Sequence, residues 1–127
     1  MNQRPLVRGL QVCQQVIVEE RTRNWTLVNC FSRLETHGFP SEPFQFDVHA
    51  VLCDGKGDVE LRVVIYRLAD RQEVFQKSMG CHFKNRLNEY RIKFPVKGLR
   101  IPSPGRYEVS LVADNEEIGQ TCFVVVL

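Results

Sequence analysis

The sequence contains no apolar run long enough to cross a membrane. The longest, Phe123–Leu127, falls far short of the roughly 20 residues that a spanning helix needs. The N-terminus is basic, but Gln11, Gln14 and Gln15 interrupt the apolar segment that an export signal requires. We therefore expect a cytoplasmic protein that does not associate with membranes.

Paired cysteines are missing too. The five cysteines are odd in number, lie at wide and irregular intervals and include no Cys-x-x-Cys motif. This pattern argues against a disulfide framework, and in a reducing cytosol we expect free thiols that behave as small hydrophobic side chains.

The sequence also carries no catalytic motif of useful specificity. His37, His49 and His82 could serve as bases, but no strand-to-helix nucleophile turn and no cysteine-protease context surrounds any cysteine. We expect no enzymatic activity and no cofactor.

One metal hypothesis can be formulated from the histidines and cysteines. If strand alternation holds, His49 and Cys53 share a strand face, and Cys81 with His82 would complete four nitrogen and sulfur ligands suited to zinc. Adjacent residues of a regular strand point to opposite sides, so this site would need a bulge at residues 81 and 82. We therefore expect no resident metal.

What the sequence does contain is strand periodicity. Apolar residues occupy alternate positions over Phe44–Leu52, which predicts a strand with Gln45, Asp47 and His49 facing outward. The glycine-rich segment 53–58 then predicts a hairpin that pairs this strand with Val59–Tyr66.

The remaining elements are also predicted as strands. Upstream, 10–20 and 25–35 form a first hairpin, although a helix over 10–21 stays open as an alternative, and 37–43 is a loop. Downstream we expect strands near 73–79, 90–96, 106–113 and 117–127, with Pro95 marking a sheet edge or a strand end. The structure of 80–88 is left open.

About eight strands without a convincing helix predict an all-β fold. We expect a two-sheet immunoglobulin-like sandwich that forms a single domain over residues 1–127, with 1–8 as a flexible N-terminal arm. A jelly-roll-like sandwich or a small barrel is the alternative.

Two sets of residues carry a family resemblance. The segment 104–109, Pro-Gly-Arg-Tyr-Glu-Val, resembles the late strand of immunoglobulin-like domains, in which Tyr107 would pack at the corner. Together with Thr26–Phe31, Phe39-Pro40 and Asp54-Gly55, it resembles a family of small bacterial immunoglobulin-like proteins of unknown function. The resemblance implies the fold but assigns no functional residue.

Charge is distributed unevenly. Residues 71–106 hold nine basic and two acidic side chains, a net charge of +7, whereas the remainder has a net charge of −5. Such asymmetry can create a basic interaction face. The candidates for that face are Lys84, Arg86, Arg91, Lys93, Lys97 and Arg100.

These features favour a non-enzymatic protein-interaction or scaffold module with an unidentified protein partner. A homodimer formed by edge pairing is an additional expectation. One alternative is a sandwich that binds a small molecule or carbohydrate through Trp25, Phe31, Phe39 and Phe44. Another is weak nucleic-acid binding through residues 71–106, although the interleaved exposed aromatics of a single-strand platform are missing.

Overall fold

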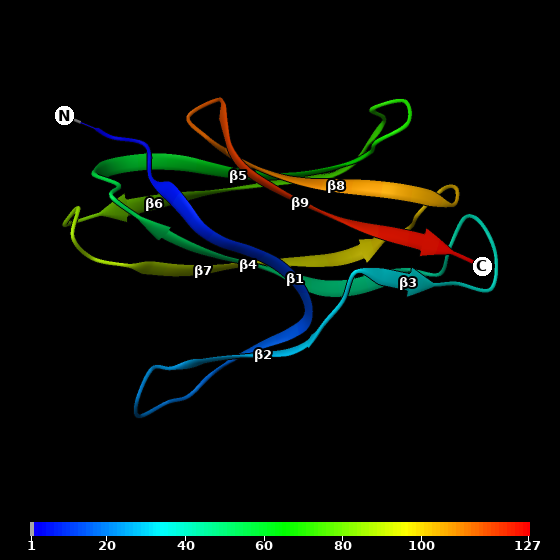
Figure 1. The fold of residues 1–127 in the computed structure, drawn as a ribbon, viewed down its shortest axis with the longest axis horizontal. Helices are drawn as coiled ribbons and strands as arrows, with labels where there is room; N and C mark the ends of the chain where they lie inside the picture. Colours follow the sequence, from blue (N-terminus) through cyan, green and yellow to red (C-terminus); the bar gives the residue numbers. More distant parts are fainter. Residues whose placement is uncertain (1) are drawn as a thin grey trace.

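A computed structural model describes residues 2–127, which contain no helix and therefore no helix that could cross a membrane. Two antiparallel layers of strands face each other (Figure 1). One sheet has the order β2-β1-β4-β7 and the other β3-β9-β8-β5-β6, with the short β3 parallel to β9. The strands are β1 Leu6–Val18, β2 Trp25–Cys30, β3 Arg33–Glu35, β4 Phe44–Cys53, β5 Gly57–Arg67, β6 Glu73–Phe83, β7 Tyr90–Leu99, β8 Gly105–Ala113 and β9 Glu116–Val126.

The core is built by the alternation that the sequence predicts. Inward side chains of β4 and β7 meet those of β5 and β8, and most of them are fully buried. The two-sheet sandwich is confirmed, with nine strands where about eight are expected. The shared inward set is Phe46, Val48, Ala50, Leu52, Val59, Leu61, Val63, Ile65, Ile92, Phe94, Val96, Tyr107, Val109, Leu111 and Ala113.

The predicted hairpin between Phe44–Leu52 and Val59–Tyr66 is wrong. Both strands exist, but β4 lies in one sheet and β5 in the other, so the turn at Asp54–Lys56 carries the chain across the sandwich. The positive φ angles of Asp54 (61°) and Gly57 (79°) allow this sharp change of direction. Both strands still present one apolar face to the same core, because they approach it from opposite sides.

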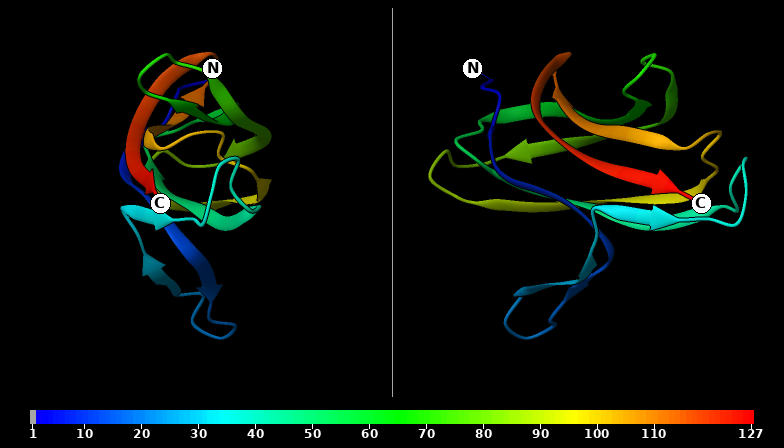
Figure 2. Two further views of the ribbon diagram at one scale, coloured as in Figure 1. Left: turned by 90° about the vertical axis from the view of Figure 1, so that its right-hand side faces the viewer. Right: turned by 45° about the vertical axis from the view of Figure 1, so that its right-hand side comes forward.

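The first hairpin is confirmed as β1 paired with β2, and the helical alternative over 10–21 is wrong. The predicted strand 25–35 is divided, since β2 ends at Cys30 and β3 joins the other sheet. The second half of β1 bends out of the two layers and forms a hairpin with β2. This hairpin lies below the sheet that contains β4 and β7 (Figures 1 and 2).

That hairpin lies over the outer face of β4. The backbone N–H of Val16 donates to Asp47 Oδ2 over 2.9 Å, and the ring of Trp25 lies against the ring of His49. His49 is therefore only 1% exposed, although alternation alone places it outward. The prediction that His49 faces solvent is wrong because Trp25, distant in sequence, covers it.

The N-terminal segment differs from the predicted free arm over residues 1–8. Gln3 forms an antiparallel bridge with Lys56, and β1 begins at Leu6. The side chain of Arg4 also donates to the carbonyl of Ala113 over 3.2 Å and pairs with Glu116. Residues 2–8 are thus tied to the sandwich at several points.

Two finer predictions are confirmed. The buried Tyr107 donates its hydroxyl hydrogen to the carbonyl of Ser103 over 2.7 Å, which fixes the corner before β8. Pro95 lies in β7, the edge strand of its sheet, which is a position where a residue without a backbone N–H is tolerated. The open segment 80–88 divides into the end of β6, up to Phe83, and a loop that leads into β7.

Candidate functional site

The six basic residues proposed as an interaction face do not lie together. Arg91, Lys93 and Lys97 form one exposed strip, since alternate residues of β7 point outward. Lys84 and Arg86 sit in the loop before β7. Arg100 follows β7 at its far end, where it donates to the carbonyl of Ser41 over 3.2 Å.

The strip on β7 borders a groove beneath the β1–β2 hairpin. Lys93 and Lys97 line one side of this hollow of about 620 Å³, and Gln14 and Gln15 line it from the hairpin. Asp47 lines it as well, and Glu89 pairs with Arg91 at 3.3 Å. These carboxylates offset part of the positive charge, which weakens the groove as an anion site.

The four aromatic residues considered for a ligand pocket are also separated. Phe31 and Phe44 line one hollow of about 330 Å³, but Phe31 packs edge-on against the core ring of Phe46 at 5.3 Å. Phe39 is half-buried against the core, and Trp25 covers His49. Core packing and hairpin attachment account for all four rings.

The structure also separates the four proposed zinc ligands. His49 and Cys53 lie in β4, whereas Cys81 and His82 lie in β6 of the opposite sheet. Residues 2–127 contain no group of three or more potential ligands placed to hold a metal ion. The four-residue zinc hypothesis is therefore wrong.

The free edges of the two sheets are the remaining candidate sites, and their strands differ in length and in protection against pairing with another strand. β2 and β3 are short, with six and three residues, and β7 carries Pro95 together with three outward basic side chains. β6 has 11 residues, and among the strands of residues 2–127 it pairs only with β5. Its other side presents unpaired backbone groups that can accept a further strand.

Protection against unwanted pairing covers only the first half of β6. Lys77 pairs with the buried Val63, so its side chain begins on the core-facing side of β6. An inward-pointing charged residue on an edge strand commonly blocks edge-to-edge pairing. The following residues, Ser78–Cys81, carry no charge and no proline. The second half of β6 is thus an unprotected part of a long sheet edge.

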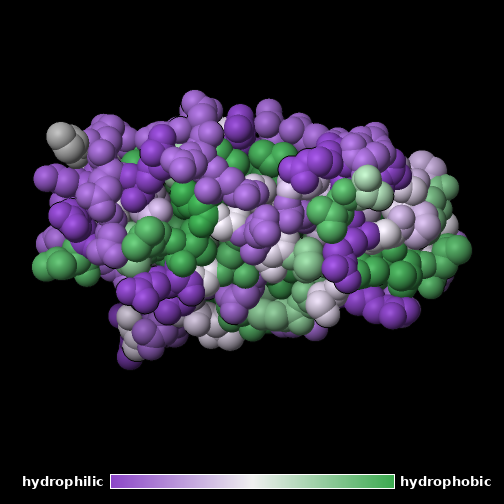
Figure 3. Space-filling view, turned by 45° about the horizontal axis from the view of Figure 1, so that its top comes forward, coloured by the Kyte–Doolittle hydropathy of each residue, from purple (hydrophilic) through white to green (hydrophobic). Residues whose placement is uncertain are grey.

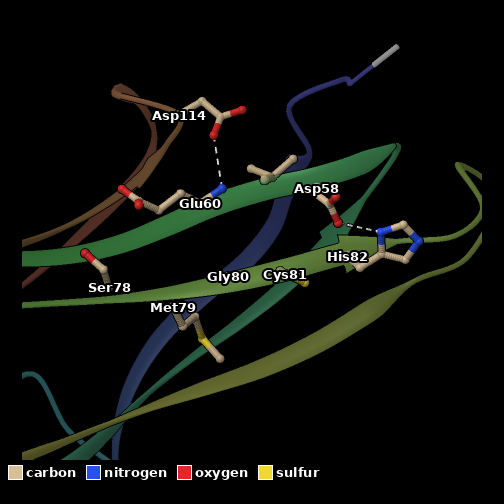
Figure 4. A pocket seen from close by; sticks show the side chains of 9 residues that line it. Asp58, Glu60, Ser78, Met79, Gly80, Cys81, His82 and Asp114 are labelled. Carbon is tan, nitrogen blue, oxygen red and sulfur yellow. Dashed lines mark hydrogen bonds and ion pairs between the residues drawn. The ribbon is translucent and has the colours of Figure 1, made fainter.

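Gly80 makes a notch in this second half. It lies opposite Glu60 of β5, and a side chain added at Gly80 would meet nothing within 4 Å. The hollow over the β5–β6 edge has a volume of about 720 Å³ (Figure 4). Glycine costs roughly 0.5–1 kcal/mol in a strand relative to alanine, and a strand glycine often marks close approach by another backbone.

Acidic side chains line the outer side of this notch. Asp58 Oδ1 lies 2.7 Å from His82 Nδ1, and Asp114 Oδ1 accepts the backbone N–H of Glu60 over 3.0 Å (Figure 4). Asp114 reaches this position because the β8–β9 turn, with positive φ at residues 114 and 115, abuts β5. The Glu60 carboxylate forms no hydrogen bond or ion pair within the described chain.

Figure 3 shows how apolar and hydrophilic side chains are distributed on one face of the molecule. Hydrophilic side chains interrupt the apolar areas across this face of the molecule. A large contiguous apolar patch is the usual mark of docking on a sheet face.

Sequence reasoning missed the β6 edge because residues 80–88 show little periodicity. A usable signal was nevertheless present, since the uncharged Ser78–Cys81 contains a glycine inside a strand that begins near Glu73. Only the sheet order shows that this strand lies at an edge.

A family model described as a family of unknown function, DUF6941, matches residues 9–126. No curated protein matches the chain.

Solved structures show similarity in fold. The alkylpurine DNA glycosylase AlkC of Pseudomonas fluorescens, bound to DNA with an abasic-site analogue, is 12% identical with a TM-score of 0.52. The match covers 95% of this chain but only 30% of that one. An immunoglobulin-like protein of Pseudomonas aeruginosa is 10% identical with a TM-score of 0.44, and 97% of each chain is covered. The CARDB domain of a Pyrococcus furiosus protein is 14% identical with a TM-score of 0.44, covering 97% of this chain and 94% of that one.

Proposed function

Since the chain belongs to the DUF6941 family of unknown function, we propose that it is a non-enzymatic protein-interaction module that binds an extended partner segment as an additional strand on β6. The single observation that carries this proposal is Gly80, placed without steric need in the unprotected half of a long edge strand. In strand addition, main-chain hydrogen bonds supply affinity and alternate side chains supply specificity.

The position of Gly80 supports a role outside folding. Gly80 does not have a positive φ angle, and a Cβ atom added to it would meet no other atom within 4 Å. A β-branched residue would favour the strand conformation there. Glycine is therefore a small cost to the sheet that leaves open space over its outer face, where a side chain of an added strand can lie.

We also propose that the module works in the cytoplasm of a bacterial cell. In residues 2–127 all five cysteines are free thiols, as suits a reducing compartment, and the family resemblance implies a bacterial source.

The proposal is tested by selecting displayed random peptides of about 12 residues, enough to span β6, on the immobilised chain. Binding of the selected peptides is then measured with the wild-type chain and with Gly80→Val and Gly38→Val. Gly38 is the matched control, because a side chain added there also meets nothing within 4 Å. We expect at least tenfold weaker binding to Gly80→Val, unchanged binding to Gly38→Val, and no loss of thermal stability in either variant.

Selection that yields no peptide whose affinity depends on position 80 would overturn strand addition at β6. Sedimentation of the chain without peptide gives a further outcome. A dimer that dissociates in Gly80→Val but not in Gly38→Val would support the same edge and identify a second copy as the partner.

A second candidate, weak nucleic-acid binding, is favoured by the exposed strip of Arg91, Lys93 and Lys97 on β7. Fluorescence anisotropy with a single-stranded oligonucleotide tests it. Binding that falls steeply between about 50 and 200 mM salt, and falls further in the variant with Lys93 and Lys97 both changed to Gln, would support it. No binding at the lower salt concentration would end it.

A further inference from the structure

We infer that the partner segment carries an arginine or lysine at the position beside Gly80, so that its cationic group lies over the notch. This inference rests on the proposed strand addition and names the partner's chemistry. It is drawn from three features of the described chain: the missing side chain at residue 80, the reach from the edge to β5, and the charge on β5 and the neighbouring turn.

The first step concerns reach. Neighbouring strands lie about 4.8 Å apart, so a residue added beside Gly80 would be two strand spacings, roughly 10 Å, from the backbone of Glu60. Gly80 presents no side chain in the intervening row. Only a long side chain can cross that row and approach the Glu60 carboxylate, and arginine and lysine are the long side chains with a cationic end.

The second step concerns charge. Asp58, Glu60 and Asp114 all line the notch, and Asp58 is paired with His82. The Glu60 carboxylate has no partner in the part of the chain that the structure describes. A cation placed over Gly80 therefore meets a surplus of negative charge, whereas an acidic side chain there would be repelled.

The third step fixes the position along the strand. Ser78, two residues before Gly80 on the same outer face, stands opposite Arg62. A cation beside Ser78 would lie nearer to Arg62 than one beside Gly80. Charge complementarity thus favours the basic residue beside Gly80 and disfavours it two residues away in that direction.

The test uses three synthetic peptides, acetyl-Ser-Thr-Val-Thr-Xaa-Thr-Val-Thr-Ser-amide, with arginine, alanine or glutamate at the central position. Their affinities for the full chain are measured by amide chemical-shift titration. The same titrations are run on a Glu60→Gln, Asp114→Asn double variant. Asparagine at position 114 keeps the side-chain oxygen that accepts the Glu60 N–H, and it tolerates the positive φ of 46° at that residue.

We expect the arginine peptide to bind about 1.5-fold to fivefold more tightly than the alanine peptide, the range of an exposed ion pair, and the glutamate peptide to bind least. In the double variant the arginine and alanine peptides should bind equally, with the alanine peptide unchanged. If all three bind the wild-type chain equally at β6, the basic-residue inference is overturned and strand addition stands. If none shifts the amides of Gln76–Phe83, strand addition itself fails.

Discussion

The indole ring of Trp25 covers the imidazole ring of His49, with ring centroids 5.5 Å apart and planes inclined by 49°. This contact joins the β1–β2 hairpin to the outer face of β4. Replacing Trp25 by alanine should lower the free energy of unfolding by about 1–3 kcal/mol, because the packing of a large ring is lost. Chemical denaturation measures this change, and Trp25→Phe, which keeps a ring, should lose less. Equal losses in the two variants would contradict a packing role.

Burial of His49 predicts a pH dependence of stability. Burial, followed by the nearby Arg91 charge, lowers the pKa of His49 below its ordinary value of 6.5. The unfolded chain therefore binds a proton at a higher pH than the folded chain. Stability should be fully present above about pH 6.5 and should fall as the pH drops from there through the lowered pKa.

Unfolding free energies measured between about pH 5 and 8 check this slope against His49→Gln, which has no titrating group at that position. The variant should show a flatter profile in this window. A profile identical to that of the wild-type chain would show that His49 does not cause the slope.

The free thiols should differ in reactivity. Cys13 is fully buried, and burial raises the pKa of its thiol to about 11, with further contributions from Cys30 and Asp47. Cys30 and Cys122 are exposed. Iodoacetamide at neutral pH should modify these two first and reach Cys13 only after unfolding, since the thiolate is the reactive form. Mass spectrometry of digested protein reports each site, and early labelling of Cys13 would contradict its burial.

The corner formed by Tyr107 should contribute measurably to stability. Tyr107→Phe removes the 2.7 Å hydrogen bond to the Ser103 carbonyl and should cost about 1–2 kcal/mol. Tyr90→Phe is the matched control, because the Tyr90 hydroxyl accepts the N–H of the exposed Lys84, which water can satisfy instead. Urea denaturation should show the larger loss for Tyr107→Phe, and the reverse order would contradict the corner's role.

Alternation in the sequence predicts which side chains enter the core, and the inward positions of β4, β5, β7 and β8 are confirmed. A period of two specifies the face of a strand but not the sheet to which it belongs. For that reason the crossing from β4 to β5 at Asp54–Lys56 could not be predicted from the sequence. The burial of His49 under Trp25 depends on a non-local contact that no local pattern contains.

The basic strip and the β6 edge show the same limit. Counting charges locates an excess of basic residues, yet β7 gathers only Arg91, Lys93 and Lys97, and the loop and Arg100 lie elsewhere. Gly80 is visible in the sequence, but its meaning depends on the sheet order that leaves β6 without a second neighbour among the described strands.

The central claim, that β6 accepts a partner strand at Gly80, is tested most directly by amide hydrogen exchange of the full chain with and without the arginine peptide. Alternate amides of Gln76–Phe83 point away from β5 and should exchange more slowly when the peptide is bound, because a new ladder satisfies them. Gly80→Val should abolish this protection, while Gly38→Val should keep it. Protection that appears along β7 or in the loops, with β6 unchanged, would contradict the account.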